Sequence, residues 1–459
     1  MQIEKHTINF VPEDERHGKP FDLFLVWFGA NLNLTTIIMG SFLVFLGLNL
    51  FWSVAAIIVG SLLGNLFVAS HSAQGPQLGI PQMIQSRAQF GVFGAIIPMI
   101  CVMFIYLGFG VANTLLVTQT LSETTSLSSN SIIVLFSLVS IVIAIFGYKL
   151  IHKTQKWLSI CSFIILGIAT IIAFGRGFPV GSWSVSAVEM HLFFMGVGIV
   201  ATYVLALAPY VADYSRYLPA NSSPKKVFFF TYSGLCLSTS WMMAMGAILT
   251  VLIPEFADNS GVSLAGLFSS FPIILFALII YGLLAINVFN FYGVFMAVVT
   301  TVQPFKKLDV TQGMRIGIFA AVLVINIVLS IISSQGDFFN TFINFIYFIG
   351  YFLIPWTAIN LVDFYFLKHG KYDIASIFDA NGIYGKFNGI TIFTFIFAIL
   401  AEIPFISTMM YEGPIATKLG GVDLAWVVGL VVASVTYYVL NKLQASKSVK
   451  PVATTEVMQ

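Results

Sequence analysis

The chain has 459 residues, of which 58% are hydrophobic and only 9% are charged. Its mean hydropathy of +0.94 excludes a soluble globular protein, because no soluble domain sustains this value over such a length. The formal net charge of +2 gives no support for a nucleic-acid-binding surface. The sequence therefore predicts an all-α polytopic membrane protein with a single transmembrane domain.

Twelve apolar runs, each of about twenty residues and long enough to cross a bilayer, follow one another along the chain. They predict a transmembrane domain at 23–441, between a polar N-terminal segment at 1–22 and a polar tail at 442–459. The predicted spans are 23–47, 51–71, 91–121, 130–148, 157–175, 191–212, 227–253, 271–301, 314–333, 338–367, 388–408 and 421–441.

The positions of the basic residues predict the orientation of these spans. With the N-terminus on the inner side, every Lys and Arg except Arg176 and Lys418 falls in an inner segment. Basic residues are retained in the cytoplasm, so both termini are predicted to be cytoplasmic. The expected location is a plasma membrane or a bacterial inner membrane, with lipid around the spans.

The first span contains the sequence Trp27-Phe28-Gly29-Ala30-Asn31-Leu32-Asn33. An amide in hydrocarbon must find a partner, and a neighbouring Gly weakens the helix. Backbone that opens onto a buried binding site meets both conditions, so the helix is predicted to be interrupted here. In transporters built from inverted repeats, such a broken helix carries half of the substrate and ion site.

A matching interruption is expected in span 6 if spans 1–5 and 6–10 form inverted repeats. Gly196, Gly198 and Pro209 favour a break in that span. The alternative is that these residues have no special role, because Gly and Pro are common in membrane helices.

The connection between spans 2 and 3, residues 74–91, is rich in Gly, Pro and Gln and carries one basic residue, Arg87. This composition is typical of turns and loops. A cytoplasmic turn segment is predicted there.

Few ionisable residues lie within the spans, where such residues are costly and usually functional. Asp213 and Asp363 stand at the ends of spans 6 and 10, where a structural cap or an ion pair is expected. Glu402 is the one carboxylate well inside a predicted span. A buried structural role is favoured for Glu402 over a proton relay, because span 11 lies outside the proposed repeats.

Neutral polar residues are more informative about a ligand. Phe109 and Asn113 lie four residues apart in span 3, and Asn287 and Asn290 lie three apart in span 8, so each pair shares a helix face. An aromatic face with an amide one turn away suits a flat heterocycle, which can stack and form hydrogen bonds. The alternative is an aromatic packing contact and amides that join helices. Amides without carboxylates favour a neutral ligand.

Seven short motifs, in order along the chain, resemble the nucleobase/cation symporter family, and most closely its purine-cytosine permease branch. That family also includes hydantoin and allantoin transporters. The resemblance covers most of the chain, and its motifs are Pro12–Gly18, Trp27–Asn31, Gly75–Gly79, Gln82–Gly91, Gly108–Asn113, Asp213–Tyr217 and Asn287–Tyr292.

The resemblance implies a LeuT-like fold, with a five-plus-five inverted repeat and two further C-terminal helices, that works by alternating access. In the family, an aromatic residue and an amide of span 3 bind the substrate ring; they correspond to Phe109, with Phe in place of the usual Trp, and to Asn113. Asn33 corresponds to a substrate-facing residue of span 1. The aromatic partner on span 6 corresponds to Tyr203 or its neighbour Val204, and Tyr203 is preferred.

The resemblance also implies a cation site between spans 1 and 8. Its ligands correspond to the carbonyl oxygens of Gly29, Leu32 and Asn287 and to the side chains of residues 290 and 291. In this chain Asn290 stands in place of a hydroxyl residue and Phe291 has no oxygen. Sodium prefers several hard oxygen ligands, so a sodium ion at Gly29, Leu32, Asn287 and Asn290 and a coupling proton are alternatives. No other cofactor is expected, and Asn287 and Asn290 are also expected to bind substrate.

Together these features predict a secondary active importer of a neutral nucleobase or related heterocycle, of the cytosine, purine, allantoin or hydantoin type, driven by proton or sodium symport. An enzyme is not expected, because the sequence shows no catalytic cluster and no cytoplasmic domain. The alternatives are a facilitative channel, which needs a continuous polar pore, and a non-transporting heterocycle sensor. The transporter is expected to act as a monomer and without a nucleic-acid partner.

Overall fold

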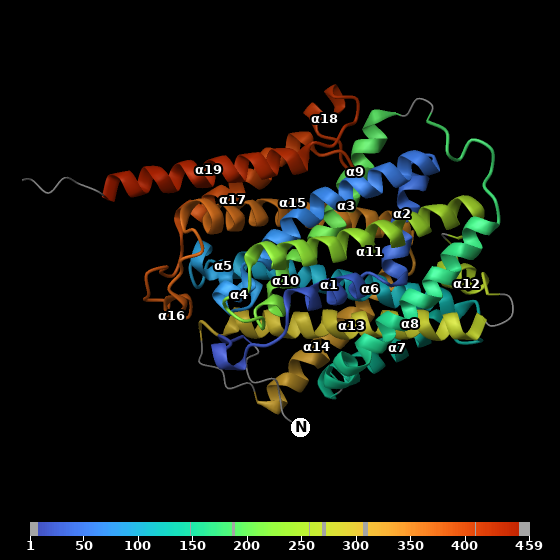
Figure 1. The fold of residues 1–459 in the computed structure, drawn as a ribbon, viewed down its shortest axis with the longest axis horizontal. Coiled ribbons are helices and arrows are strands. Elements are labelled where there is room, and N and C mark those ends of the chain that lie inside the picture. Colours follow the sequence, from blue (N-terminus) through green and yellow to red (C-terminus); the bar gives the residue numbers. More distant parts are fainter. Residues whose placement is uncertain are drawn as a thin grey trace, which may run out of the picture.

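The computed structural model describes residues 8–146, 148–185, 189–256, 258–268, 272–305, 311–408 and 410–448. Over these residues the regular elements are helices, and the β-type pairing is limited to an isolated bridge between Ser407 and Glu412. The long helices lie side by side in one bundle, with α5 (Gln82–Phe90) at one end and α12 (Ser260–Ala265) at the other (Figure 1). The substrate and ion sites of such a bundle are expected between its long helices.

Nine of the described helices are long and apolar enough to cross a membrane, and the bent pair α1 (Pro20–Ala30) and α2 (Leu34–Phe45) makes a tenth. Two further apolar helices, α7 (Ser129–Phe146) and α17 (Gly389–Glu402), are shorter. Each predicted span thus contains a helix, but helix length does not establish twelve crossings. The remaining long elements are α3 (Leu50–Ser72), α6 (Ile96–Ser122), α8 (Tyr148–Gly175), α9 (Met190–Leu205) with α10 (Ala208–Ser215), α11 (Pro224–Leu252), α13 (Pro272–Val302), α14 (Gln312–Ser333), α15 (Phe338–Val362) and α19 (Ala425–Ser448).

The predicted interruption of the first span is confirmed. α1 ends at Ala30, α2 begins at Leu34, and the two helix axes differ in direction by 62°. Asn33 caps the second half: its Oδ1 accepts a hydrogen bond from the backbone N–H of Thr36 (3.0 Å), and its Nδ2 donates to the carbonyl of Ala30 (2.8 Å). One amide therefore satisfies backbone groups on both sides of the break, as helix ends in an apolar environment require.

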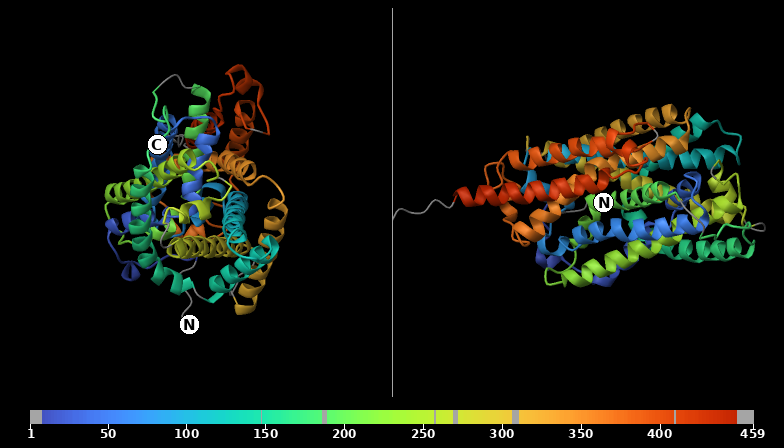
Figure 2. Two further views of the ribbon diagram at one scale, coloured as in Figure 1. Left: turned by 90° about the vertical axis from the view of Figure 1, so that its right-hand side faces the viewer. Right: turned by 90° about the horizontal axis from the view of Figure 1, so that it is seen from above.

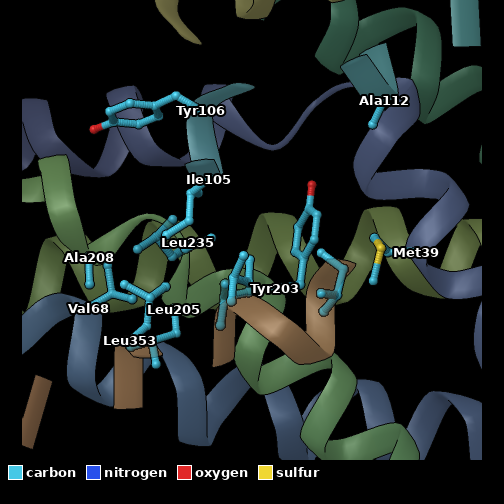
Figure 3. Packing of buried hydrophobic residues seen from close by; sticks show 14 of the residues in the cluster. Met39, Val68, Ile105, Tyr106, Ala112, Tyr203, Leu205, Ala208, Leu235 and Leu353 are labelled. Carbon is cyan, nitrogen blue, oxygen red and sulfur yellow. The ribbon is translucent and has the colours of Figure 1, made fainter. Parts of the chain in front are cut away.

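Span 6 is also interrupted, but closer to its proline than to its glycines. α9 ends at Leu205 and α10 begins at Ala208, next to Pro209, whereas Gly196 and Gly198 lie inside α9. Proline has no N–H to continue the helical ladder, which explains the position of the break. Figure 3 shows Leu205 and Ala208, on either side of the break, beside Val68 of α3 and Leu353 of α15.

Glycines allow two pairs of helices to approach backbone to backbone. A Cβ on Gly40 of α2 would overlap the carbonyl oxygen of Met243, and a Cβ on Gly246 of α11 would overlap that of Ile37. Gly60 and Gly64, four residues apart in α3, make a similar contact with α9. Small residues at such crossings are typical of membrane helix packing. The two broken spans are therefore held directly against α11 and α3.

The connection between spans 2 and 3 differs from the turn predicted there. It forms α4 (Gly75–Leu78) and α5, and every residue of α5 is buried. Asp213 of α10 accepts a hydrogen bond from the backbone N–H of Gln82 (2.7 Å), so this carboxylate caps α5. The connection is thus part of the packed bundle and is joined to α10, the second half of span 6.

The described part of the N-terminal segment is docked on the same region. Arg16 is buried, and its guanidinium donates to the carbonyl oxygens of Val11 (2.9 Å) and Pro76 (2.7 Å). Burial lowers the pKa of Arg16, and the nearby Glu13 carboxylate opposes that shift. At the other end of the chain α19 continues to Ser448, beyond the predicted boundary at 441, and projects past the other helices (Figure 2). Residues 1–7 and 449–459 lie outside the described part of the chain.

Candidate functional site

A cavity of about 1650 Å³ begins at the break in the first span and extends along the bundle. It reaches the end of the bundle that carries the N-terminal segment, where Ile8, Arg216 and Thr311 line it. Its volume exceeds that of a typical small-molecule pocket, so it includes both a binding region and the passage that leads to it.

Most of the residues predicted from the sequence line this cavity. They are Gly29, Asn33, Phe109, Asn113, Tyr203 and Asn290. Leu32 and Asn287 are not among the described residues that line it, although both are buried. The structure therefore brings together four elements, α1, α6, α9 and α13, that are far apart in the sequence.

Asn113 and Asn287 belong to a buried chain of hydrogen bonds that joins α2, α6 and α13. Thr35 Oγ1 donates to Asn113 Oδ1 (2.6 Å), and Asn113 Nδ2 donates to Asn287 Oδ1 (3.2 Å). Asn287 Nδ2 in turn donates to Thr114 Oγ1 (3.2 Å). Asn287 thus orients Asn113 from the side away from the cavity. Amides joined in this way lose rotational freedom, which places the polar edge of Asn113 in a fixed position.

Asn290 and Asn33 differ in what they can offer a ligand. Asn290 is 8% exposed, and its Nδ2 has no hydrogen-bond partner within the described chain. A buried amide without a partner costs free energy unless a ligand or water supplies one. Asn33 also lines the cavity, but its amide already bonds to Thr36 and Ala30. Asn290 is therefore the better candidate for a direct hydrogen bond, and Asn33 shapes the helix break.

Phe109 and Tyr203 touch each other in this conformation. Their ring centroids are 5.9 Å apart with an interplanar angle of 76°, an edge-to-face contact. Phe109 also contacts Phe342 and Phe345 of α15 edge to face, at 6.0 and 5.4 Å. Tyr203 is held by a hydrogen bond between its hydroxyl and Thr36 Oγ1 (2.9 Å). These aromatic rings close the cavity toward α15, and a heterocycle between Phe109 and Tyr203 requires the two rings to move apart and become parallel.

A second aromatic group lines the cavity and was not predicted as part of the site. Trp27 contacts Tyr214 edge to face (5.2 Å) and Tyr210 (6.2 Å), and Tyr210 contacts Tyr106 (5.6 Å). All four rings, together with Asp213, line the passage. A partial signal for this group is present in the sequence, because Trp27 lies in the motif of the first break and Tyr214 follows Asp213. Tyr106 stands three residues before Phe109, and only the three-dimensional packing shows that it faces the cavity.

Of the predicted sodium ligands, the side chains of span 8 offer few oxygen atoms. Gly29 lines the cavity, and its carbonyl already accepts a hydrogen bond from the N–H of Leu32 (3.2 Å). Phe291 is fully buried and packs against Gly110 of α6. The side chain of Asn287 is engaged with α6, which leaves Asn290 as the one span 8 side chain of the predicted set that lines the cavity. A sodium ion, which prefers several oxygen ligands, would therefore depend here mainly on the backbone carbonyl oxygens of Gly29, Leu32 and Asn287.

Asn31 anchors the break of the first span to α11. Its Nδ2 donates to Ser238 Oγ (3.0 Å) and to Thr239 Oγ1 (2.9 Å), and the residue is 3% exposed. Asn31→Ala removes both hydrogen bonds, so we expect the free energy of unfolding to fall by about 1–3 kcal/mol. A lower melting temperature of purified protein in detergent measures this loss. Asn441→Ala is the control, because that amide bonds within its own helix, to the carbonyl of Tyr437; equal melting temperatures for the two variants would contradict the anchoring role.

Comparison with known proteins agrees with this geometry. A family model described as permease for cytosine/purines, uracil, thiamine, allantoin matches residues 10–429. Over 447 residues the chain is 53% identical to YxlA of Bacillus subtilis strain 168, whose name assigns it to the purine-cytosine permeases. That alignment covers 97% of this chain and 98% of YxlA.

Two solved structures of Mhp1 have the same fold. The inward-facing conformation of Mhp1 matches with a TM-score of 0.77 and 16% identity, over 97% of this chain and 95% of that chain. A closed conformation with bromovinylhydantoin bound, named as a nucleobase-cation-symport-1 family transporter, matches with a TM-score of 0.76 and 16% identity, over 97% and 96%. The LeuT-like helical fold class expected from the sequence is thereby confirmed.

Proposed function

Because the chain belongs to the family of permeases for cytosine and purines, uracil, thiamine and allantoin, we propose that it is a secondary active importer of a neutral nucleobase or related heterocycle. Transport is coupled to the symport of a cation, a proton or sodium, and proceeds by alternating access. The observation that carries this proposal is the unpartnered amide Nδ2 of Asn290, a residue that lines the cavity together with Phe109 and Asn113. Such a site offers stacking and hydrogen bonds without requiring a charged ligand.

Binding follows from the arrangement of these side chains. The heterocycle enters between Phe109 and Tyr203 when their edge-to-face contact opens, and its ring faces stack on the two aromatic rings. Asn290 then forms a hydrogen bond with its polar edge, and Asn113, whose amide is held by Thr35 and Asn287, offers only its second Nδ2 hydrogen. Movement of α15, which carries Phe342 and Phe345, opens or closes the far end of the cavity.

The orientation of the protein in the membrane is inferred from the distribution of its basic residues. Arg16, Arg87, Arg216 and Arg315 belong to the inner segments predicted from the sequence, and the cavity reaches Arg216 and Arg315. Basic residues are retained in the cytoplasm, so the cavity is open to the cytoplasm in this conformation and both termini are cytoplasmic. Lys5, Lys306, Lys307 and Lys450 lie outside the described residues. The membrane is the plasma membrane or a bacterial inner membrane, and the functional unit is a monomer.

Counterflow tests the proposal against its alternatives. Proteoliposomes are loaded with unlabelled cytosine, adenine, hypoxanthine, allantoin or hydantoin. They are then diluted into buffer that contains a trace of the same compound in labelled form. A carrier exchanges at least one of these compounds faster than protein-free liposomes and does not exchange labelled leucine, the control. Binding without exchange would favour a sensor, and flux without stimulation by the internal compound would favour a channel. If none of the five compounds is bound and none is exchanged, the proposed substrate class is contradicted.

A further inference from the structure

A second polar cluster lies outside the central cavity, between α15, α17 and α19. It consists of Glu402 at the end of α17, Asp423 in the connection before α19, and Tyr347 and Tyr351 of α15. α15 packs against α9, α17 and α19. Tyr347, Tyr351 and Asp423 also line a small cavity of about 20 Å³ that reaches α9, the outer half of span 6.

Glu402 is buried without a partner. The residue is 0% exposed, and neither of its carboxyl oxygens has a hydrogen-bond partner in the described chain. Gly429 of α19 provides the space for it, because a Cβ at that position would overlap Glu402 Oε1. A carboxylate with no donor and no cation beside it is very costly in an apolar environment. The side chain is therefore present as the neutral acid in this conformation.

Asp423 has a different environment. Its carboxylate accepts hydrogen bonds from the backbone N–H groups of Ser407 (2.8 Å) and Ala425 (2.9 Å) and from the hydroxyl of Tyr351 (3.3 Å). Burial raises the pKa of Asp423, and these three hydrogen bonds oppose that shift. Within the described chain no Lys, Arg or His forms an ion pair with Glu402 or Asp423. Asp423 is thus a buried carboxylate with three hydrogen-bond donors, whereas Glu402 has none and requires a proton.

The small cavity is a second, independent observation that supports proton exchange at this site. The hydroxyl of Tyr347, a residue that is 7% exposed, points to no hydrogen-bond partner among the described residues, and it lines the cavity together with Asp423. The volume is enough for one water molecule, which needs polar partners of this kind. A water bound there would bridge the tyrosine and the carboxylate and carry a proton between solvent and the acid pair.

α15 connects this cluster to the substrate cavity. One part of the helix places Phe342 and Phe345 against Phe109 at the closed end of the cavity, and Tyr351, further along, donates to Asp423. A movement of α15 that separates Phe109 from Phe345 would also displace the tyrosine from the carboxylate. The packing thus joins opening of the substrate site to a change in the surroundings of the acid pair.

We propose that Glu402 and Asp423 form the proton-binding site through which a proton gradient drives transport. This inference rests on the proposed function and names its coupling ion. In the conformation described here the proton is held on Glu402. In this cytoplasm-facing state the O–H bond of Glu402 breaks when water reaches it, and the proton passes to that water and leaves to the cytoplasm. The carboxylate is protonated again from the outer side when α15 moves and opens the far end of the cavity.

Glu402→Gln tests this proposal because glutamine is similar in shape to the protonated acid but cannot release a proton. The probe is labelled cytosine in proteoliposomes with an imposed pH gradient. We expect the variant to lose accumulation above equilibrium and to keep counterflow exchange. Glu412→Gln is the control, since Glu412 is an exposed carboxylate in the same connection as Asp423. Accumulation by Glu402→Gln at the wild-type level, or accumulation by the wild type with sodium alone, would overturn the proposal.

A second readout does not depend on transport. Infrared difference spectra of the purified protein in nanodiscs, between acidic and alkaline pH, report the C=O band of a buried protonated carboxyl group. We expect the wild type and Glu412→Gln to show this band and Glu402→Gln to lack it; a band unchanged in Glu402→Gln would overturn the proposal.

If cytosine counterflow is absent in the wild type, the proposed substrate fails while the infrared result still decides the proton site. If Glu402→Gln does not fold, Asp423→Asn replaces it: loss of the neighbouring negative charge should make Glu402 easier to ionise and shift the band's pH midpoint downward, and an unchanged midpoint would overturn the pairing.

Discussion

Gly246→Val is expected to abolish the folded transporter. A Cβ at Gly246 would overlap the carbonyl oxygen of Ile37 in α2, and Gly40 makes the reciprocal contact with Met243 of α11. Overpacking in a fixed interior costs about 1–3 kcal/mol and more where backbone atoms cannot give way. Here two helix backbones would have to separate, and α2 is the second half of the broken first span. Loss of the monodisperse peak in size-exclusion chromatography of the solubilised protein measures this effect.

The matched control for this substitution is Gly167→Val in α8. No atom lies within 4 Å of a Cβ built at Gly167, so the same side chain should be accommodated there. Both substitutions add the same volume to a glycine in a long apolar helix, which separates the effect of the close crossing from the effect of the residue type. Wild-type elution and melting of Gly246→Val would show that α2 and α11 can separate without loss of the fold.

Phe109→Ala is expected to weaken substrate binding by about 1–3 kcal/mol, the range found when an aromatic side chain that stacks on a base is removed. This corresponds to a roughly 5- to 150-fold increase in the dissociation constant. The reason is that Phe109 lines the cavity at the level of Asn113 and supplies one of the two ring faces. Equilibrium binding of labelled cytosine to the purified protein measures the change.

Phe104→Ala is the control for Phe109→Ala. Phe104 lies in the same helix and contacts the same Phe345 (5.6 Å), but it is 45% exposed on the outside of the bundle. Its removal should leave the dissociation constant close to that of the wild type. If the two variants bind equally well, Phe109 is a packing residue and the stacking part of the account is wrong.

The first break could be predicted because its cause is local. Gly29, Asn31 and Asn33 stand together in an apolar run, and such residues require internal partners wherever the chain folds. The break in span 6 was placed less well, since Gly and Pro both signal a possible interruption and only Pro209 acts on the helix ladder at that point.

The burial of α5 could not be predicted from its composition. Gln82, Gln85, Arg87 and Gln89 read as a polar turn, but in the folded chain all four are buried, and Arg87 and Gln89 find partners on distant helices. Gln89 Nε2 donates to Asp363 (3.0 Å), and Arg87 donates to the carbonyl of Thr300 (2.9 Å). These partners are more than 200 residues away in the sequence. A composition rule describes the segment alone and contains no information about what it packs against.

The roles of individual side chains within the site could not be predicted from their spacing either. Spacing placed Asn287 and Asn290 on one helix face, but Asn290 lines the cavity while Asn287 bonds to α6. The difference depends on the position of α6 relative to α13, which only the fold supplies. Likewise, Glu402 was recognised as unusual from its place in an apolar run, whereas its neighbour Asp423 was not, because it stands at the very start of the predicted span 421–441, where an acidic residue is ordinary.

If a cation gradient drives import of a heterocycle, labelled cytosine should accumulate inside proteoliposomes to a concentration above that outside. A proton and a sodium gradient are imposed separately, with a protonophore control. With one proton per substrate, a pH difference of about one unit can sustain a roughly tenfold concentration ratio. We predict accumulation above equilibrium under the proton gradient and its collapse when the protonophore is added. Equilibration without accumulation under either gradient would contradict the account.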